Sequence, residues 1–68
     1  MGFVMSYQYS VLLRMVKNTE TVLITMVPIM AVDSYTAGQK ALGVLDRDFP
    51  DSITVLSVKL IEDKLHKD

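Results

Sequence analysis

The sequence predicts a small α+β domain with the element order strand, strand, helix, strand. Tyr7 to Val16 alternates apolar and polar residues with a period of two, which is typical of a strand. Ser34 to Asp48 repeats apolar residues at helical spacing, and Ser52 to Glu62 returns to a period of two. We expect one domain over residues 1–68, with an ordered core at about 6–62 and a polar tail at 63–68.

The composition excludes several classes of protein. The 68 residues include seven Lys or Arg, eight Asp or Glu, one His and no Cys. Without Cys there is neither a disulfide framework nor a thiolate zinc site. The net charge of −1 argues against nucleic-acid binding as a dedicated role. The longest apolar run, Val22 to Val32, is about half of what a membrane-spanning helix needs. We therefore expect a cytoplasmic protein with no membrane segment.

The first two strands are expected to form a hairpin. Lys17 to Glu20 is polar and lies between two apolar runs, so it predicts a four-residue connection in which Asn18 tolerates the turn geometry. Thr21 to Val32 reads as a strand that is apolar on both faces. Pro28 has no amide hydrogen to donate to a ladder, which places this strand at a sheet edge or at a bulge.

Asp33-Ser34 is a helix N-cap signal, and Pro50 cannot continue a helix, so it marks the end of the element before it. The intervening segment predicts an amphipathic helix of about four turns. Gly38 lies on its apolar side, where we expect an approach to the sheet so close that no larger residue fits. Gly43 lies on the other side, and the sequence offers no physical account of it.

Two sheet topologies are compatible with this order. If the third strand lies beside the first, the sheet is antiparallel with the order 2-1-3. If it lies beside the second, that pair is parallel. The preference of Pro28 for an edge favours the order 2-1-3, with the helix on one face of the sheet.

One helix covers one face, so the other face of the sheet has no cover from this chain. Because the second and third strands are apolar on both sides, we expect apolar residues to remain outside and to form an interface. The expected interface residues are Leu23, Val27 and Ile29, with Arg14 and Lys59 at the rim. A domain this small is marginal alone, so a homo-oligomer, most simply a dimer, is expected.

Residues suited to chemistry are few. His66 is the only imidazole and lies in the polar tail. Asp46, Asp48 and Asp51 could hold a hard cation through oxygen, although solvated loop acids are the commoner case. The sequence therefore predicts no enzyme, no catalytic residue, no metal ligand and no cofactor. Its leading function is a non-enzymatic protein-interaction module that self-associates or docks on a partner protein through a sheet face or edge strand.

The alternative function is a small-ligand or nucleic-acid binding module with a site formed between subunits. Its candidate stacking residues are Tyr7, Tyr9 and Tyr35. Single-stranded nucleic acid would also need basic groups beside these rings. Tyr7 and Tyr9 lie on the face of the first strand that is expected to meet the core, so packing is the simpler role for these two residues.

One architectural resemblance extends over about residues 7 to 61. A hairpin, then Ala31-x-Asp33-Ser34-x-x-Ala37-x-x-x-Ala41, then a strand such as Val55-Leu56-Ser57-Val58, resembles tiny phage-encoded β-β-α-β proteins. Some proteins of that type bind and inhibit a host enzyme. The resemblance thus implies inhibition of a host protein as one form of docking. It carries over no functional residue, because an Ala-x-x-x-Ala face also serves packing.

Overall fold

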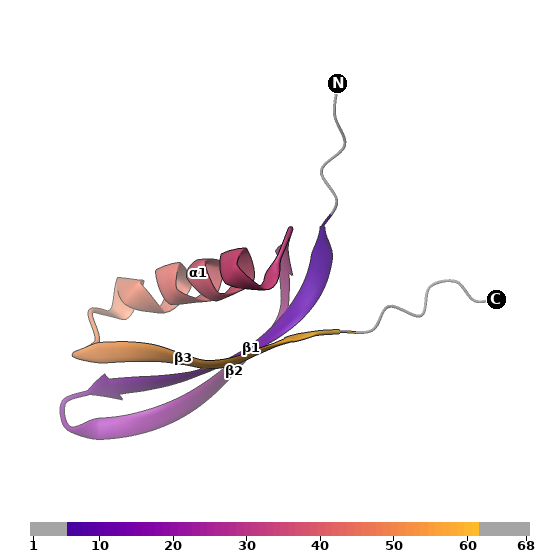
Figure 1. The fold of residues 1–68 in the computed structure, drawn as a ribbon. Coiled ribbons are helices and arrows are strands. Elements are labelled where there is room, and N and C mark those ends of the chain that lie inside the picture. The colour runs from indigo at the N-terminus through magenta and orange to yellow at the C-terminus, as the bar shows by residue number, and fades with distance from the viewer. Residues whose placement is uncertain (1–5, 62–68) are drawn as a thin grey trace.

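The computed structural model describes residues 6–61 and contains three strands and one α-helix in that segment. Strand β1 spans Tyr7–Lys17, β2 spans Glu20–Ala31, helix α1 spans Ser34–Leu45 and β3 spans Ser52–Leu60. The sheet order is β2-β1-β3 with both pairs antiparallel, and α1 lies on one face (Figure 1). The predicted α+β fold with strand order 2-1-3 is confirmed. The predicted tail at 63–68 lies outside the described residues.

The hairpin connection is shorter than predicted. Lys17 pairs with Glu20, so only Asn18 and Thr19 link β1 to β2. Both residues have positive φ, 53° and 65°, as the primed two-residue turns of hairpins require. Asn18 tolerates this conformation, whereas it strains a β-branched residue such as Thr19. The Asn18 amide donates to the Asp51 carboxylate at 3.1 Å, which ties the turn to the segment that leads into β3.

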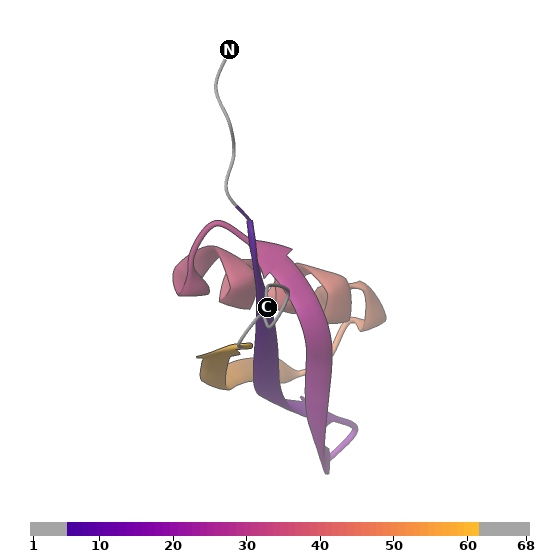
Figure 2. The same cartoon turned by 90° about the vertical axis from the view of Figure 1, so that its right-hand side faces the viewer.

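The core lies between the central strand and α1. Tyr9, Val11 and Leu13 of β1 are buried, as are the small residues of one side of α1, Ala37, Gly38 and Ala41. Small side chains let the helix approach the sheet closely. The end view in Figure 2 shows the helix on one side of the strongly twisted sheet.

Strand β3 contains one more residue than β1 where the two strands pair. Leu12 faces Ser57 but Leu13 faces Val55, so Leu56 is an inserted bulge residue. The bulge reverses the alternation along β3. As a result Val55 and Val58, which a regular strand would place on opposite faces, both lie under α1 at the position of Gly38.

Strand β2 contains a second bulge. Tyr9 faces Ile29 and Val11 faces Met26, so Val27 and Pro28 together stand opposite Ser10. Met26 and Ile29 therefore both pack against the core. The expectation that Ile29 belongs to an interface on the uncovered face is wrong, because the bulge at Val27 and Pro28 moves Ile29 to the helix side.

The ends of α1 follow the sequence signals in part. Asp33 is the N-cap, and its Oδ1 accepts a hydrogen bond from the Thr36 amide at 2.8 Å, as predicted. This bond to the backbone N–H of Thr36, supported by a side-chain interaction with Thr36, lowers the pKa of Asp33. At the other end α1 stops at Leu45, and the last predicted turn is a short 3₁₀ segment, Asp46–Asp48, followed by Phe49 at φ 53°.

The glycines of α1 provide the first test. A Cβ at Gly38 would lie 3.8 Å from methyl groups of Val55 and Val58, which is ordinary contact, so the expectation that nothing larger fits is wrong for one methyl group. We expect Gly38→Ala to raise the free energy of unfolding by about 1 kcal/mol through helix propensity, with a further gain from methyl burial. Urea denaturation measures this change.

Gly43→Ala is the matched control. A Cβ at Gly43 meets nothing within 4 Å, so only the propensity gain is expected. A lower stability for Gly38→Ala than for Gly43→Ala would contradict the packing described for α1 on β3.

The β3 bulge provides a second test through two aspartate substitutions. With the bulge, Val55 lies under the helix and Ser57 lies on the exposed side. Val55→Asp is expected to cost several kcal/mol because it places a carboxylate in the core, whereas Ser57→Asp is expected to stay within about 0.5 kcal/mol of the wild type. Circular dichroism during urea denaturation compares the two. Equal destabilisation by both changes would mean that Val55 and Ser57 share a face, as they would in a strand without a bulge.

The N-cap provides a third test through pH. Because the native pKa of Asp33 is lowered, its carboxylate stabilises the folded state fully above the unfolded pKa of about 3.9. This contribution is lost as the pH falls through the native pKa. We expect the stability of the wild type to decline more steeply below about pH 4 than that of Asp33→Asn, which keeps a capping oxygen but does not titrate. Parallel pH profiles for the two proteins would contradict the capping role of the carboxylate.

Candidate functional site

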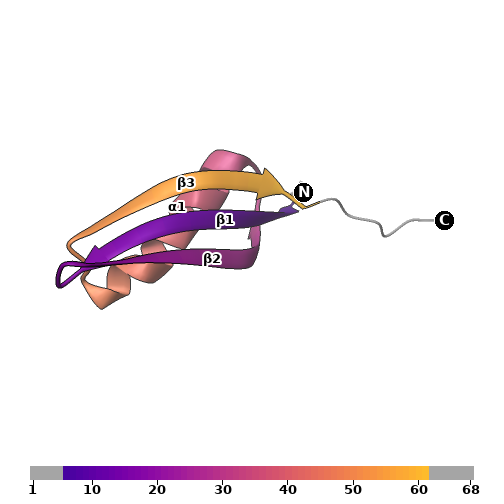
Figure 3. The same cartoon turned by 90° about the horizontal axis from the view of Figure 1, so that it is seen from below.

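The candidate site is the sheet face opposite α1, which Figure 3 shows from below; we call it the open face. Its members follow from alternation and from the residues paired across the strands. From β1 they are Gln8, Ser10, Leu12, Arg14 and Val16; from β2, Thr21, Leu23, Thr25, Val27, Pro28 and Met30; from β3, Ser52, Thr54, Leu56, Ser57 and Lys59.

The largest group of exposed apolar residues on the open face lies along β2. Leu23, Val27 and Met30 of β2 are exposed, with 63%, 57% and 46% of their surface accessible, and Leu12 of β1 is half-buried beside them. These four residues form what we call the aliphatic strip. The β3 side of the open face is mostly polar, because β3 contributes four Ser, Thr or Lys residues there beside one exposed aliphatic residue, the bulge residue Leu56.

The charged residues of the open face are both cations. Arg14 faces Leu23 on β2 and Thr54 on β3, and Lys59 faces Ser10. Both cations are exposed. The five Asp and Glu residues within residues 6–61 lie elsewhere: Asp33, Asp46, Asp48 and Asp51 lie at the ends of α1 and in the loop before β3, and Glu20 pairs with Lys17 beside the turn.

The structure brings together four of the five residues expected at an interface. Leu23, Val27, Arg14 and Lys59 belong to the open face, whereas Ile29 is half-buried on the helix side. Sequence reasoning missed Leu12 and Met30 as members of the strip. The alternation of β1 could have indicated Leu12, but Met30 could be assigned a face only once the bulge at Val27 and Pro28 was known.

The aromatic residues of the described segment lie away from these cations. Tyr9 is buried in the core, and Tyr7 pairs with Ala31 on the helix side. Tyr35 belongs to α1, and Phe49 follows the 3₁₀ segment at the end of that helix. A stacking platform for single-stranded nucleic acid combines aromatic rings with basic groups in one groove. Within residues 6–61 the rings are on the helix side and the open face has the cations Arg14 and Lys59, so these residues do not form one platform.

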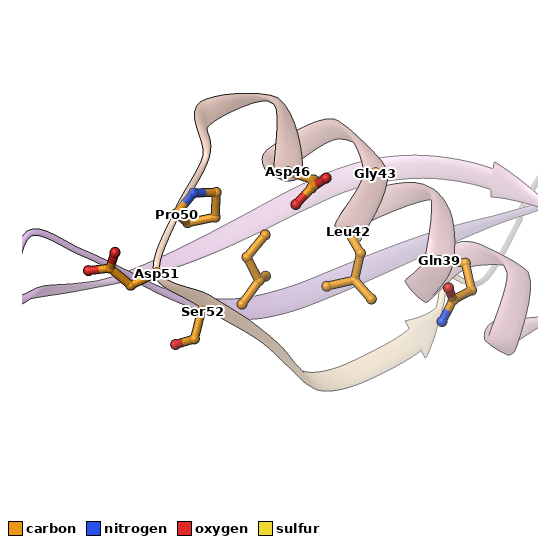
Figure 4. A pocket seen from close by; sticks show the side chains of 8 residues that line it. Gln39, Leu42, Gly43, Asp46, Pro50, Asp51 and Ser52 are labelled. Atoms are coloured by element: carbon orange, nitrogen blue, oxygen red, sulfur yellow. The ribbon is translucent and has the colours of Figure 1, made fainter.

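A second concave region lies between the end of α1 and the start of β3, with a volume of about 460 Å³ (Figure 4). Leu42 and Ile53 line it from the two elements, and Asp46 lies at its rim beside Gly43. The Asp51 carboxylate accepts the hydrogen bond from Asn18. The cleft is shallow and open, and it combines an apolar floor with carboxylates that are exposed to water.

The loop acids do not form a metal centre. Within the part of the chain that the structure describes, no three His, Asp or Glu side chains come together as cation ligands, and Asp46, Asp48 and Asp51 are included in that statement. His66 lies outside residues 6–61. The helix of the described segment is too short and too polar to cross a bilayer.

Comparisons with known proteins give no further guide to the site. No family model, curated protein or solved structure matches this chain. The resemblance to tiny phage proteins therefore stays a prediction.

Proposed function

We propose that this chain is a non-enzymatic protein-interaction module that uses the open face of its sheet, either to self-associate or to dock on a partner protein. The observation that supports this proposal is the exposure of the aliphatic strip, above all of Leu23 and Val27, on a face that no helix of residues 6–61 covers. Inhibition of a host protein would be one form of such docking.

Energetic reasoning supports the same proposal. Full burial of a Leu or Val side chain contributes about 1.5–3 kcal/mol, so covering the strip would yield several kcal/mol. Among residues 6–61 the fully buried side chains are few, and the largest of them are only Leu13 and Val11. A domain with such a small core gains proportionately more from a partner that covers its second face.

The edge of the sheet is a weaker candidate than its face. An added strand would have to continue the ladder along β2, where Pro28 lacks an amide hydrogen and the bulge interrupts the regular spacing. On β3 the bulge at Leu56 and the charged Lys59 oppose strand addition in the same way. These features favour face docking over edge pairing.

The test substitutes aspartate within the strip. Leu23→Asp is expected to weaken any complex of the chain by about tenfold or more, because a carboxylate would have to be desolvated where an aliphatic side chain was buried. Size-exclusion chromatography with light scattering at several concentrations measures self-association. Affinity capture from cells that make the protein measures partner binding.

Thr21→Asp is the matched control, since Thr21 lies on the same strand and the same face but outside the strip. It is expected to leave binding and stability nearly unchanged. Leu23→Asp is also expected to fold as the wild type does, because Leu23 is exposed. A complex that survives both Leu23→Asp and Val27→Asp without loss of affinity would exclude the open face as the contact.

A further inference from the structure

The open face is aliphatic along β2 and mostly polar along β3, and this difference restricts what can cover it. The aliphatic strip follows β2 and the adjoining part of β1. Toward β3 the face carries Ser52, Thr54, Ser57 and Lys59, with Leu56 as the one exposed aliphatic residue of that strand on this face. A well-matched partner therefore places apolar side chains over β2 and mainly polar side chains over β3.

The sign of the charge on that face specifies the polar side chains. Arg14 and Lys59 are cations, and within residues 6–61 the open face contains no Asp or Glu. A second copy packed face to face about a twofold axis would present the same cations and no carboxylate in return. Charge complementarity therefore favours a different partner, one that carries Asp or Glu on the flank that lies toward β3.

The length of the strip suits a helix. From Leu23 to Met30 the strand advances seven residues, or roughly 23 Å at the rise of a β-strand. An α-helix covers that length with about 15 residues, or four turns. The other face of the same sheet already packs a helix of 12 residues, α1, on its apolar side chains.

We propose that the open face binds an amphipathic α-helix of a partner protein, with an aliphatic stripe over the strip and acidic residues along the flank beside Arg14 and Lys59. This inference rests on the proposed function and specifies the chemistry of the partner. The bound state would be a three-layer arrangement with a helix on each face of the sheet.

The test uses two synthetic helical peptides of about 18 residues, long enough to cover the strip. Both have Leu at every third or fourth position along one stripe; one has Glu along one flank, and the other has Lys at the same positions. Each is titrated into the isotopically labelled full chain while amide NMR signals are followed. We expect the Glu peptide to bind about tenfold more tightly than the Lys peptide at low salt, with signal changes along β1 and β2.

Two double variants with matched changes of charge show which cations matter. Arg14→Glu with Lys59→Glu is expected to reverse the preference, so that the Lys peptide binds more tightly. Lys17→Glu with Arg47→Glu makes the same change of net charge but alters cations outside the open face, and it is expected to keep the preference for Glu. Raising NaCl from about 20 mM to about 500 mM is expected to shrink the difference between the peptides.

Three results would overturn the inference: equal binding of the two peptides, loss of the preference in both double variants, or signal changes confined to α1. If the peptides show no preference while Leu23→Asp still disrupts a complex of the chain, the acidic helix is excluded and the open face stands as an interaction surface. If Leu23→Asp instead splits a homodimer of the wild type, the occupant is a second copy. If that substitution has no effect on any complex, the proposed function fails as well.

Discussion

The packing of this domain depends on one extra residue in each edge strand. Without the bulges, strict alternation would divide the apolar residues of β2 and β3 between the two faces of the sheet. Leu56 and the pair Val27 and Pro28 reset that alternation. Val55 and Val58 then lie on one face, as do Met26 and Ile29, so that these four side chains all pack against the core.

The same bulges give the open face its character. Since many large apolar residues of the edge strands turn toward α1, the opposite face keeps hydroxyl groups, two cations and a limited aliphatic strip. A uniformly apolar face would favour packing against any other apolar surface. A face that combines an aliphatic strip with cations favours partners that combine apolar and acidic side chains, because unpaired charges are costly to desolvate.

The helix meets the sheet through its smallest residues. Ala37, Gly38 and Ala41 are buried and let α1 lie close to β3. The close approach has a cost, because such small side chains bury little apolar area of their own. A hydrogen bond also links α1 to β2, since the ammonium group of Lys40 donates to the Met30 carbonyl at 2.6 Å. The core is therefore small for its number of strands, which is consistent with a domain that gains stability from a partner.

The sequence by itself determined the elements, the N-cap at Asp33 and the edge position of the strand that contains Pro28, because periodicity, capping and the missing amide of proline act locally. Arg14 and Leu23 were found from the sequence as residues of the open face. Only the tertiary structure decided on which face Ile29 and Val55 lie. A bulge is defined by how two strands pair, so it cannot be recognised in the sequence of either strand alone. Yet it changes the face on which every later residue of the bulged strand lies.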